Sequence, residues 1–134
     1  MTVKFHITGE ELEAVVDIAA SASVVGKSLA PKLGIRKRVR KIKVRQGDGS
    51  FLKANFVVNT LLKVMNSSSL LGKFAINAEV LDIENSDVIL GLSWLTVNAF
   101  LVNTQDRCLR NVNSGQVIPC SVRWISKVAI MEEE

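Results

Sequence analysis

Hydrophobic and polar residues alternate along most of the chain, and longer helical periods are scarce. A period of two is typical of strands that bury one face, whereas amphipathic helices repeat every three to four residues. We therefore expect an all-β domain in the main, with one or two short helices. Strands are predicted at residues 2–7, 12–17, 39–46, 50–61, 73–81 and 88–90, and helical turns at 28–34 and 92–97.

Turn-forming residues separate these elements. A turn is predicted at residues 8–10, and the Asp-Gly pair at 48–49 between two strands predicts a hairpin. Ser28 is a candidate cap for the first helical turn, and Gly34 is expected to end that turn. A serine-rich loop is expected at residues 66–72.

A closing hairpin is predicted over residues 101–124. Residues 113–115 suit a three-residue loop with a glycine in the left-handed position. This register places Cys108 opposite Cys120, which would allow a disulfide in an oxidising compartment.

Length and composition fit one domain. A chain of 134 residues can bury a sizeable core, and a hydrophobic fraction of 48% excludes general disorder. No internal repeat, low-complexity tract or linker divides the chain. We assign residues 1–125 to the domain and residues 126–134 to an acidic C-terminal tail.

The net charge of +4 is unevenly distributed, because residues 36–45 carry seven lysines and arginines and no acid. One interpretation is a surface that binds nucleic acid or an acidic partner. The other is a two-faced strand whose Ile42 and Val44 point inward while basic side chains cover the outer face. The second is favoured, because no aromatic residue interleaves with these charges to stack on bases.

Compartment and membrane association follow from the apolar runs. Asp17, Lys63 and Asp87 interrupt every run that could reach the length of a membrane span. The apolar run 14–25 follows three glutamates, whereas a signal peptide requires a basic region there. We therefore expect an intracellular protein, cytoplasmic or nuclear, with no membrane partner and with both cysteines as thiols.

Asp17 stands out chemically, because it lies inside that run of apolar and small residues. Burying a carboxylate is unfavourable unless it is hydrogen-bonded, paired or protonated. Asp17 could satisfy backbone amides of a local turn. Alternatively, it is a functional acid.

A second apolar run, residues 87–95, follows about seventy residues later. Together the two runs resemble the signatures of a retropepsin-like aspartic protease domain, the type found in retroviruses and LTR retrotransposons. The positions that carry this resemblance are Val15-Val16-Asp17, Ala20-Ser21 and Val24-Val25 in the first run, the short helix at 29–34, the flap-like turn Gly47-Asp48-Gly49, and Ile89-Leu90-Gly91 with Trp94-Leu95 in the second run.

This resemblance implies a small, closed, barrel-like acid-protease fold. In such enzymes two aspartates share one proton and activate a water molecule between them. The chain has one candidate, Asp17, so the resemblance implies a homodimer that brings Asp17 to its symmetry mate. It implies no metal and no cofactor.

Two residues depart from the family pattern at its centre. Family enzymes carry a hydroxyl residue at position 18, which hydrogen-bonds across the dimer axis, and a glycine at position 19. Ile18 can neither donate nor accept, and Ala19 adds a β-carbon that would require a changed backbone dihedral. We also expect Asp17 and Ile18 to be buried.

Three functions remain open. The favoured one is a pseudo-protease that acts as a structural or peptide-binding or protein-binding module. The second is an active aspartic endopeptidase with a dimeric Asp17 pair. The third is a basic domain that binds nucleic acid or an acidic protein through residues 36–45. His6 is the only histidine, and no zinc spacing, phosphate loop or serine-hydrolase motif is present.

Overall fold

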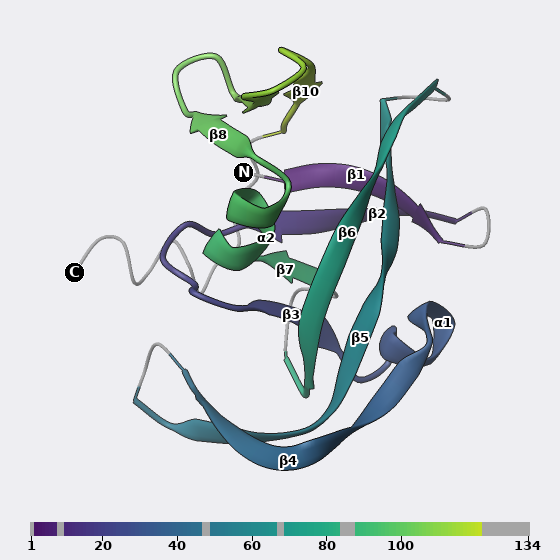
Figure 1. The fold of residues 1–134 in the computed structure, drawn as a ribbon, viewed down its shortest axis with the longest axis vertical. Helices are drawn as coiled ribbons and strands as arrows, with labels where there is room; N and C mark the ends of the chain where they lie inside the picture. The colour runs from purple at the N-terminus through teal and green to yellow at the C-terminus, as the bar shows by residue number, and fades with distance from the viewer. Residues whose placement is uncertain (1, 8–9, 47–48, 67–68, 84–87, 122–134) are drawn as a thin grey trace.

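The computed structural model describes residues 2–7, 10–46, 49–66, 69–83 and 88–121, and its strands outnumber its helices (Figure 1). The elements are β1 (Thr2–Ile7), β2 (Glu10–Val16), β3 (Ser23–Gly26), α1 (Ala30–Leu33), β4 (Ile35–Arg45), β5 (Phe51–Asn66), β6 (Ser69–Leu81), β7 (Val88–Leu90), α2 (Leu92–Val97), β8 (Phe100–Asn103), β9 (Cys108–Asn111) and β10 (Val117–Pro119). The prediction of a mainly β domain with two short helices is confirmed.

Two sheets make up the fold. Seven strands pair in the order β1-β2-β7-β3-β6-β5-β4, and β8, β9 and β10 form a small antiparallel meander. Strand β1 also meets β5, but only through the pairs Phe5 with Val64 and His6 with Lys63. The sheets therefore do not close into a regular barrel, although the mainly β prediction holds.

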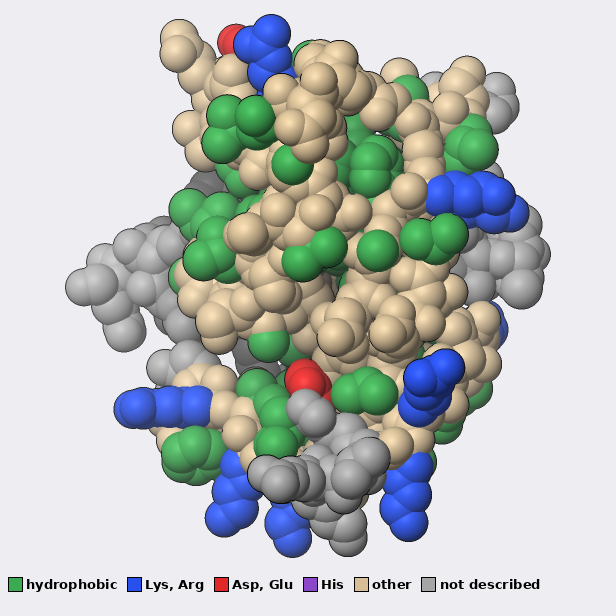
Figure 2. Space-filling model, in the orientation of Figure 1, with side chains coloured by type: hydrophobic (Ala, Val, Ile, Leu, Met, Phe, Trp, Pro, Cys, Tyr) green, Lys and Arg blue, Asp and Glu red, His purple; other side chains and the backbone are tan. Residues whose placement is uncertain are grey.

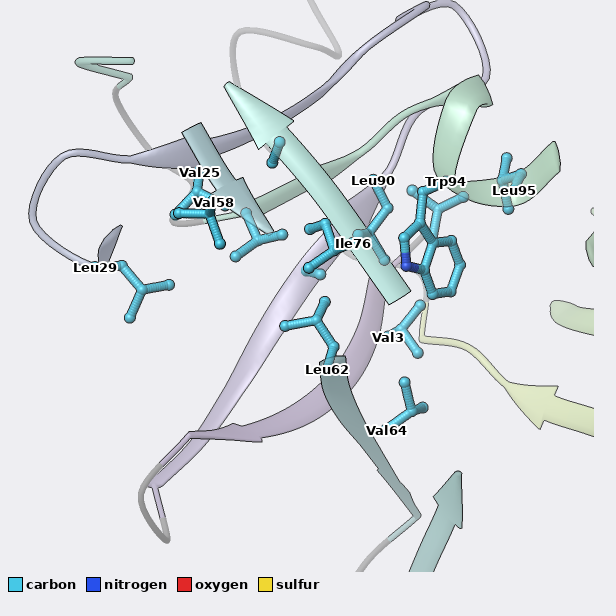
Figure 3. Close-up of a cluster of buried hydrophobic side chains, with 14 of the residues drawn as sticks. Val3, Val25, Leu29, Val58, Leu62, Val64, Ile76, Leu90, Trp94 and Leu95 are labelled. Carbon is cyan, nitrogen blue, oxygen red and sulfur yellow. The ribbon is translucent and has the colours of Figure 1, made fainter. Parts of the chain in front are cut away.

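The core lies between the large sheet and helix α2 (Figure 3). Val58, Leu62 and Val64 of β5 are buried, while the alternate residues Leu61 and Lys63 are exposed, as a period of two requires. Trp94 of α2 is 2% exposed and closes one side of this core. It stacks on Phe100 with ring centroids 5.2 Å apart, and Phe74 meets both rings edge-on.

Several element boundaries differ from the sequence prediction. The prediction of a serine-rich loop at residues 66–72 is wrong. Strand β6 begins at Ser69, which pairs with Asn66 at the end of β5. A register shift between Val64 and Met65 accommodates this extension, and the exposed positions of Ser69 and Leu70 let the pairing continue beyond the core. Strand β4 likewise begins four residues before its predicted start.

The cap of α1 is a further correction. Leu29, not Ser28, occupies the N-cap position, and no side chain bonds to the free amides there. Leu29 is buried in the core, so packing rather than capping fixes where the helix begins. Gly34 ends the helix at a φ of 80°, as predicted.

The closing hairpin is shifted by one residue from its predicted register. Cys108 lies opposite Pro119 instead of Cys120. The loop is longer because the Asn111 side chain accepts hydrogen bonds from the amides of Asn113 and Ser114 at 3.0 and 2.9 Å. Both cysteines are free, and burial raises the pKa of Cys120 to about 11, which keeps its thiol protonated at neutral pH.

Strand β4 partly matches the two-faced prediction. Val44 is half-buried against Leu52, whereas Ile42 is 36% exposed and so lies less deep than expected. Lys43 and Arg45 point to solvent. Of the predicted turn at 8–10, residues 8–9 lie outside the described residues, whereas Glu10 already begins β2. The acidic tail at 126–134 also lies outside the described residues. Among the described helices, none has the length and apolar character needed to cross a membrane.

Candidate functional site

Strand β7 brings the two sequence signatures together. It lies between β2 and β3, parallel to the first and antiparallel to the second. Val16 at the end of β2 pairs with Leu90, and the amide of Asp17 donates to the Leu90 carbonyl at 3.0 Å. Asp17 therefore begins a loop that crosses the end of β7 on its way to β3.

The loop turns sharply at its start. The Asp17 carboxylate oxygen Oδ1 accepts a hydrogen bond from the Ala19 amide at 2.9 Å, and the Asp17 carbonyl accepts one from the Ala20 amide at 3.2 Å. The local-turn role considered for Asp17 is thus present in the single chain. Asp17 is half-buried, which is less than its apolar neighbours led us to expect.

Three hydrogen bonds hold the second half of the loop against the start of α2. The Leu92 amide donates to the Ala20 carbonyl at 2.7 Å, and the Ser93 amide donates to the Ser21 carbonyl at 3.1 Å. The Gly91 amide donates to the Ser23 hydroxyl at 3.0 Å. The second signature therefore acts as a clamp on the first.

Gly91 lies at the closest approach within this clamp. A β-carbon at this position would lie 2.4 Å from the Ala22 carbonyl oxygen and 2.7 Å from that of Ala20. Both neighbours are backbone atoms, so a side chain here would displace the loop itself. The close contact between the Ile89-Leu90-Gly91 signature and the aspartate loop thus has a specific steric basis.

Ser23 is a residue of this site that sequence reasoning missed. Its side chain is 1% exposed, and its hydroxyl accepts the Gly91 hydrogen bond described above. The sequence contained a signal for this role. Ser23 precedes Val24-Val25 in an apolar run, and a polar side chain buried there needs a hydrogen-bond partner, as Asp17 does.

Ile18 and Ala19 occupy the exposed tip of the loop. Ile18 is 61% exposed, so the expectation that it is buried is wrong for the single chain. Ala19 is also exposed, and it is not among the described non-glycine residues with positive φ, which are Ala99 and Arg107. The loop therefore accepts alanine at position 19 without left-handed strain.

The flap-like turn is described only in part. Gly47 and Asp48 lie outside the described residues, whereas Gly49 has a φ of 88°. The Gln46 amide donates to the Ser50 carbonyl at 2.7 Å and closes the predicted hairpin. The end of β4, the start of β5 and the loop after β2 lie on the same side of the view in Figure 1.

Comparisons with known proteins point to one family. The family model described as gag-polyprotein putative aspartyl protease matches residues 3–97. No curated protein sequence matches the chain.

Among solved structures, the retroviral protease-like domain of Ddi1 from Leishmania major is 22% identical, with a TM-score of 0.64 over 91% of this chain and 94% of that one. This likeness confirms the retropepsin-type fold. The protease of EIAV in complex with the inhibitor HBY-793 is 21% identical over 72% of this chain and 85% of its own, with a TM-score of 0.49. The protease of simian foamy virus (mac) is 19% identical over 72% and 92%, with a TM-score of 0.45.

Proposed function

The chain belongs to the gag-polyprotein putative aspartyl protease family, and from this membership we propose that it is a homodimeric retropepsin-fold module that binds peptide or protein segments, with its peptidase activity impaired or lost. Asp17 is the proposed remnant of the catalytic pair. Ile18, Ala19, Ala20 and Ser21 form the proposed active-site loop, and residues 47–49 form the proposed flap.

The observation that carries this proposal is the exposed Ile18 beside a single aspartate. Ile18 is a large apolar side chain at the tip of a loop whose base is otherwise fixed by hydrogen bonds. Covering it with the same loop of a second copy would remove apolar surface from water and bring two Asp17 side chains toward each other. Isoleucine offers no hydrogen bond across that axis, so the loops would be held less rigidly than an aspartate pair requires.

An active endopeptidase is the second candidate, and a different observation favours it. The base of the Asp17 loop is held by backbone hydrogen bonds to Leu90 and Leu92, and Ala19 fits without a left-handed backbone. These features would position a carboxylate for catalysis. Cleavage of casein at acid pH, blocked by a statine-type inhibitor, would establish this second function.

We expect the chain to sediment as a homodimer at tens of micromolar, with Asp17, Ile18 and Ala19 near its axis. Ile18→Lys would place two ammonium groups in the interface and should raise the dimer dissociation constant at least tenfold. Leu101→Lys is the matched control, because Leu101 on β8 is 60% exposed and lies outside the loop. A wild-type chain that remains monomeric at high micromolar concentration would contradict the proposal.

Asp17→Asn is expected to leave the melting temperature unchanged or to raise it. The amide oxygen of asparagine can still accept from the Ala19 amide, while the partly buried charge is removed. Asp17→Ala deletes the acceptor and should destabilise the fold by about 1 kcal/mol. If Asp17→Asn instead lowered stability by more than about 2 kcal/mol, the native site would have to be organised around the charge.

A further inference from the structure

The β4–β5 hairpin has one face that is directed toward the core and one that is not. Val44 and Leu52 are half-buried and Ala54 is buried on the inner face. Lys43 and Arg45 are exposed on the outer face. Figure 2 shows lysine and arginine side chains gathered along the lower edge of the molecule, where Figure 1 places β4.

Strand pairing assembles four exposed residues on this outer face. Lys43 lies directly opposite Lys53, and Arg45 lies directly opposite Phe51. Residues opposite each other across an antiparallel pair share a face, with β-carbons about 5 Å apart, and alternate residues are about 7 Å apart along a strand. We call Lys43, Arg45, Phe51 and Lys53 the cationic face.

Among the residues that the structure describes, no acidic side chain of the hairpin balances the charge of this face. Like charges directly opposite each other destabilise a sheet, and no acidic residue is among the described register partners of β4. Residues 36–45 supply seven cations, and without them the net charge of +4 would become −3. A polyanion laid along the hairpin would complement this concentration of charge.

An exposed aromatic ring accompanies the cations. Phe51 is 58% exposed, although a large apolar side chain beside a core would ordinarily turn inward. The sequence of residues 36–45 contains no aromatic residue, and only the pairing of β4 with β5 places one beside Arg45. Cations that neutralise phosphates and aromatic rings that stack on unpaired bases are the two components of single-strand binding surfaces.

We propose that the cationic face binds single-stranded nucleic acid. Lys43, Arg45 and Lys53 contact consecutive phosphates, and Phe51 stacks on a base. A duplex would not offer a base face to Phe51, so the single strand is the better match. This face lies on the opposite side of the hairpin from its core-facing residues, and none of its four residues belongs to the proposed active-site loop at residues 17–21.

The test measures the fluorescence anisotropy of a labelled 20-residue oligouridylate with the full chain over a salt series. Three phosphate contacts predict a slope of log affinity against log salt of about −2. Lys43→Glu with Lys53→Glu should weaken binding at least tenfold at low salt and reduce the magnitude of that slope by about 1.4, because two of the three phosphate contacts are lost. Phe51→Ala should weaken binding about tenfold and leave the slope unchanged, because stacking releases no counterions.

The chain offers a matched control in Lys63 and Lys73, an opposed and exposed lysine pair between β5 and β6. Lys63→Glu with Lys73→Glu makes the same charge change and should weaken binding less than threefold. Asp17→Asn should not change binding, which separates this result from the peptidase proposal. Melting curves verify folding, and the uncharged pair Lys43→Gln with Lys53→Gln provides a second test.

Three results would overturn the proposal. One is the absence of oligouridylate binding at low salt. Another is equal weakening by the two lysine pairs, which would show a response to net charge alone. The third is a Phe51→Ala variant with unchanged affinity together with displacement of the oligouridylate by polyglutamate at equal charge, which would identify an acidic protein as the ligand.

Discussion

Replacing Gly91 with alanine is expected to destabilise the fold by about 3 kcal/mol or more, which is the upper end for overpacking of a rigid site. The backbone dihedrals of Gly91, with φ of −89° and ψ of −173°, are ones that alanine also adopts. The effect is therefore purely steric: the new β-carbon would lie 2.4 Å from the Ala22 carbonyl oxygen. Thermal unfolding should show a melting temperature about 10 °C lower or more.

Gly72→Ala is the control for this experiment. The nearest atoms to a β-carbon at Gly72 would belong to the far end of the Phe74 side chain, with Cζ at 2.9 Å, and not to the backbone. The cost should stay below about 1.5 kcal/mol. Equal losses from the two glycine variants would contradict the view that β7 and the aspartate loop are clamped by backbone contact. Ser23→Ala adds an independent check, because it leaves the buried Gly91 amide without its acceptor and should cost about 1–3 kcal/mol.

Alternation along the chain was sufficient to predict most strands, because burial of one face repeats every second residue. The long hairpin of β5 and β6 shows the limit of this signal. Its far end leaves the core, so Ser69 and Leu70 continue the ladder without an alternating pattern to reveal it. Backbone hydrogen bonds to β5 determine the structure there, and they do not require a particular pattern of side chains.

The order of the two signatures along the chain was sufficient to locate the site. Its internal contacts could be seen only in the folded structure. The resemblance to retropepsins placed Asp17 in a first signature and Gly91 in a second. The parallel pairing of Val16 with Leu90 and the Ser23 hydrogen bond depend on strands far apart in sequence. The exposure of Ile18 was equally hidden, because the loop leaves the sheet just where its apolar sequence suggests a continued strand.

The predicted register of the closing hairpin was wrong for a different reason. The position of the glycine predicted a three-residue loop, but the Asn111 side chain accepts hydrogen bonds from two loop amides, and the strands pair one residue away from the predicted register. A shift of one residue changes which side chains face each other. Cys108 therefore lies opposite Pro119 and no longer opposite Cys120. The same dependence on pairing hid Phe51 beside Arg45.

Combining Ile18→Thr with Ala19→Gly is expected to create peptidase activity, or to raise it roughly 100-fold, which is the order of rate lost through small misplacements of catalytic groups. The hydroxyl at position 18 would restore a hydrogen bond across the proposed axis and hold the two Asp17 carboxylates in register. Ala19 is exposed and shows no positive φ, so Ala19→Gly alone should add little. Most of the gain should therefore come from Ile18→Thr.

The assay is casein cleavage at acid pH with and without a statine-type inhibitor, run beside sedimentation of the same variants. Asp17→Asn in the double-variant background should abolish the new activity, since one proton must be shared between two carboxylates. A double variant that dimerises but does not cleave would place the defect in the flap, at residues 47–49, instead of in the loop. A double variant that is monomeric would place it in the dimer contact. Either result would show that the loss at positions 18 and 19 is not sufficient to explain an inactive site, and would leave the binding function as the one that the loop geometry supports.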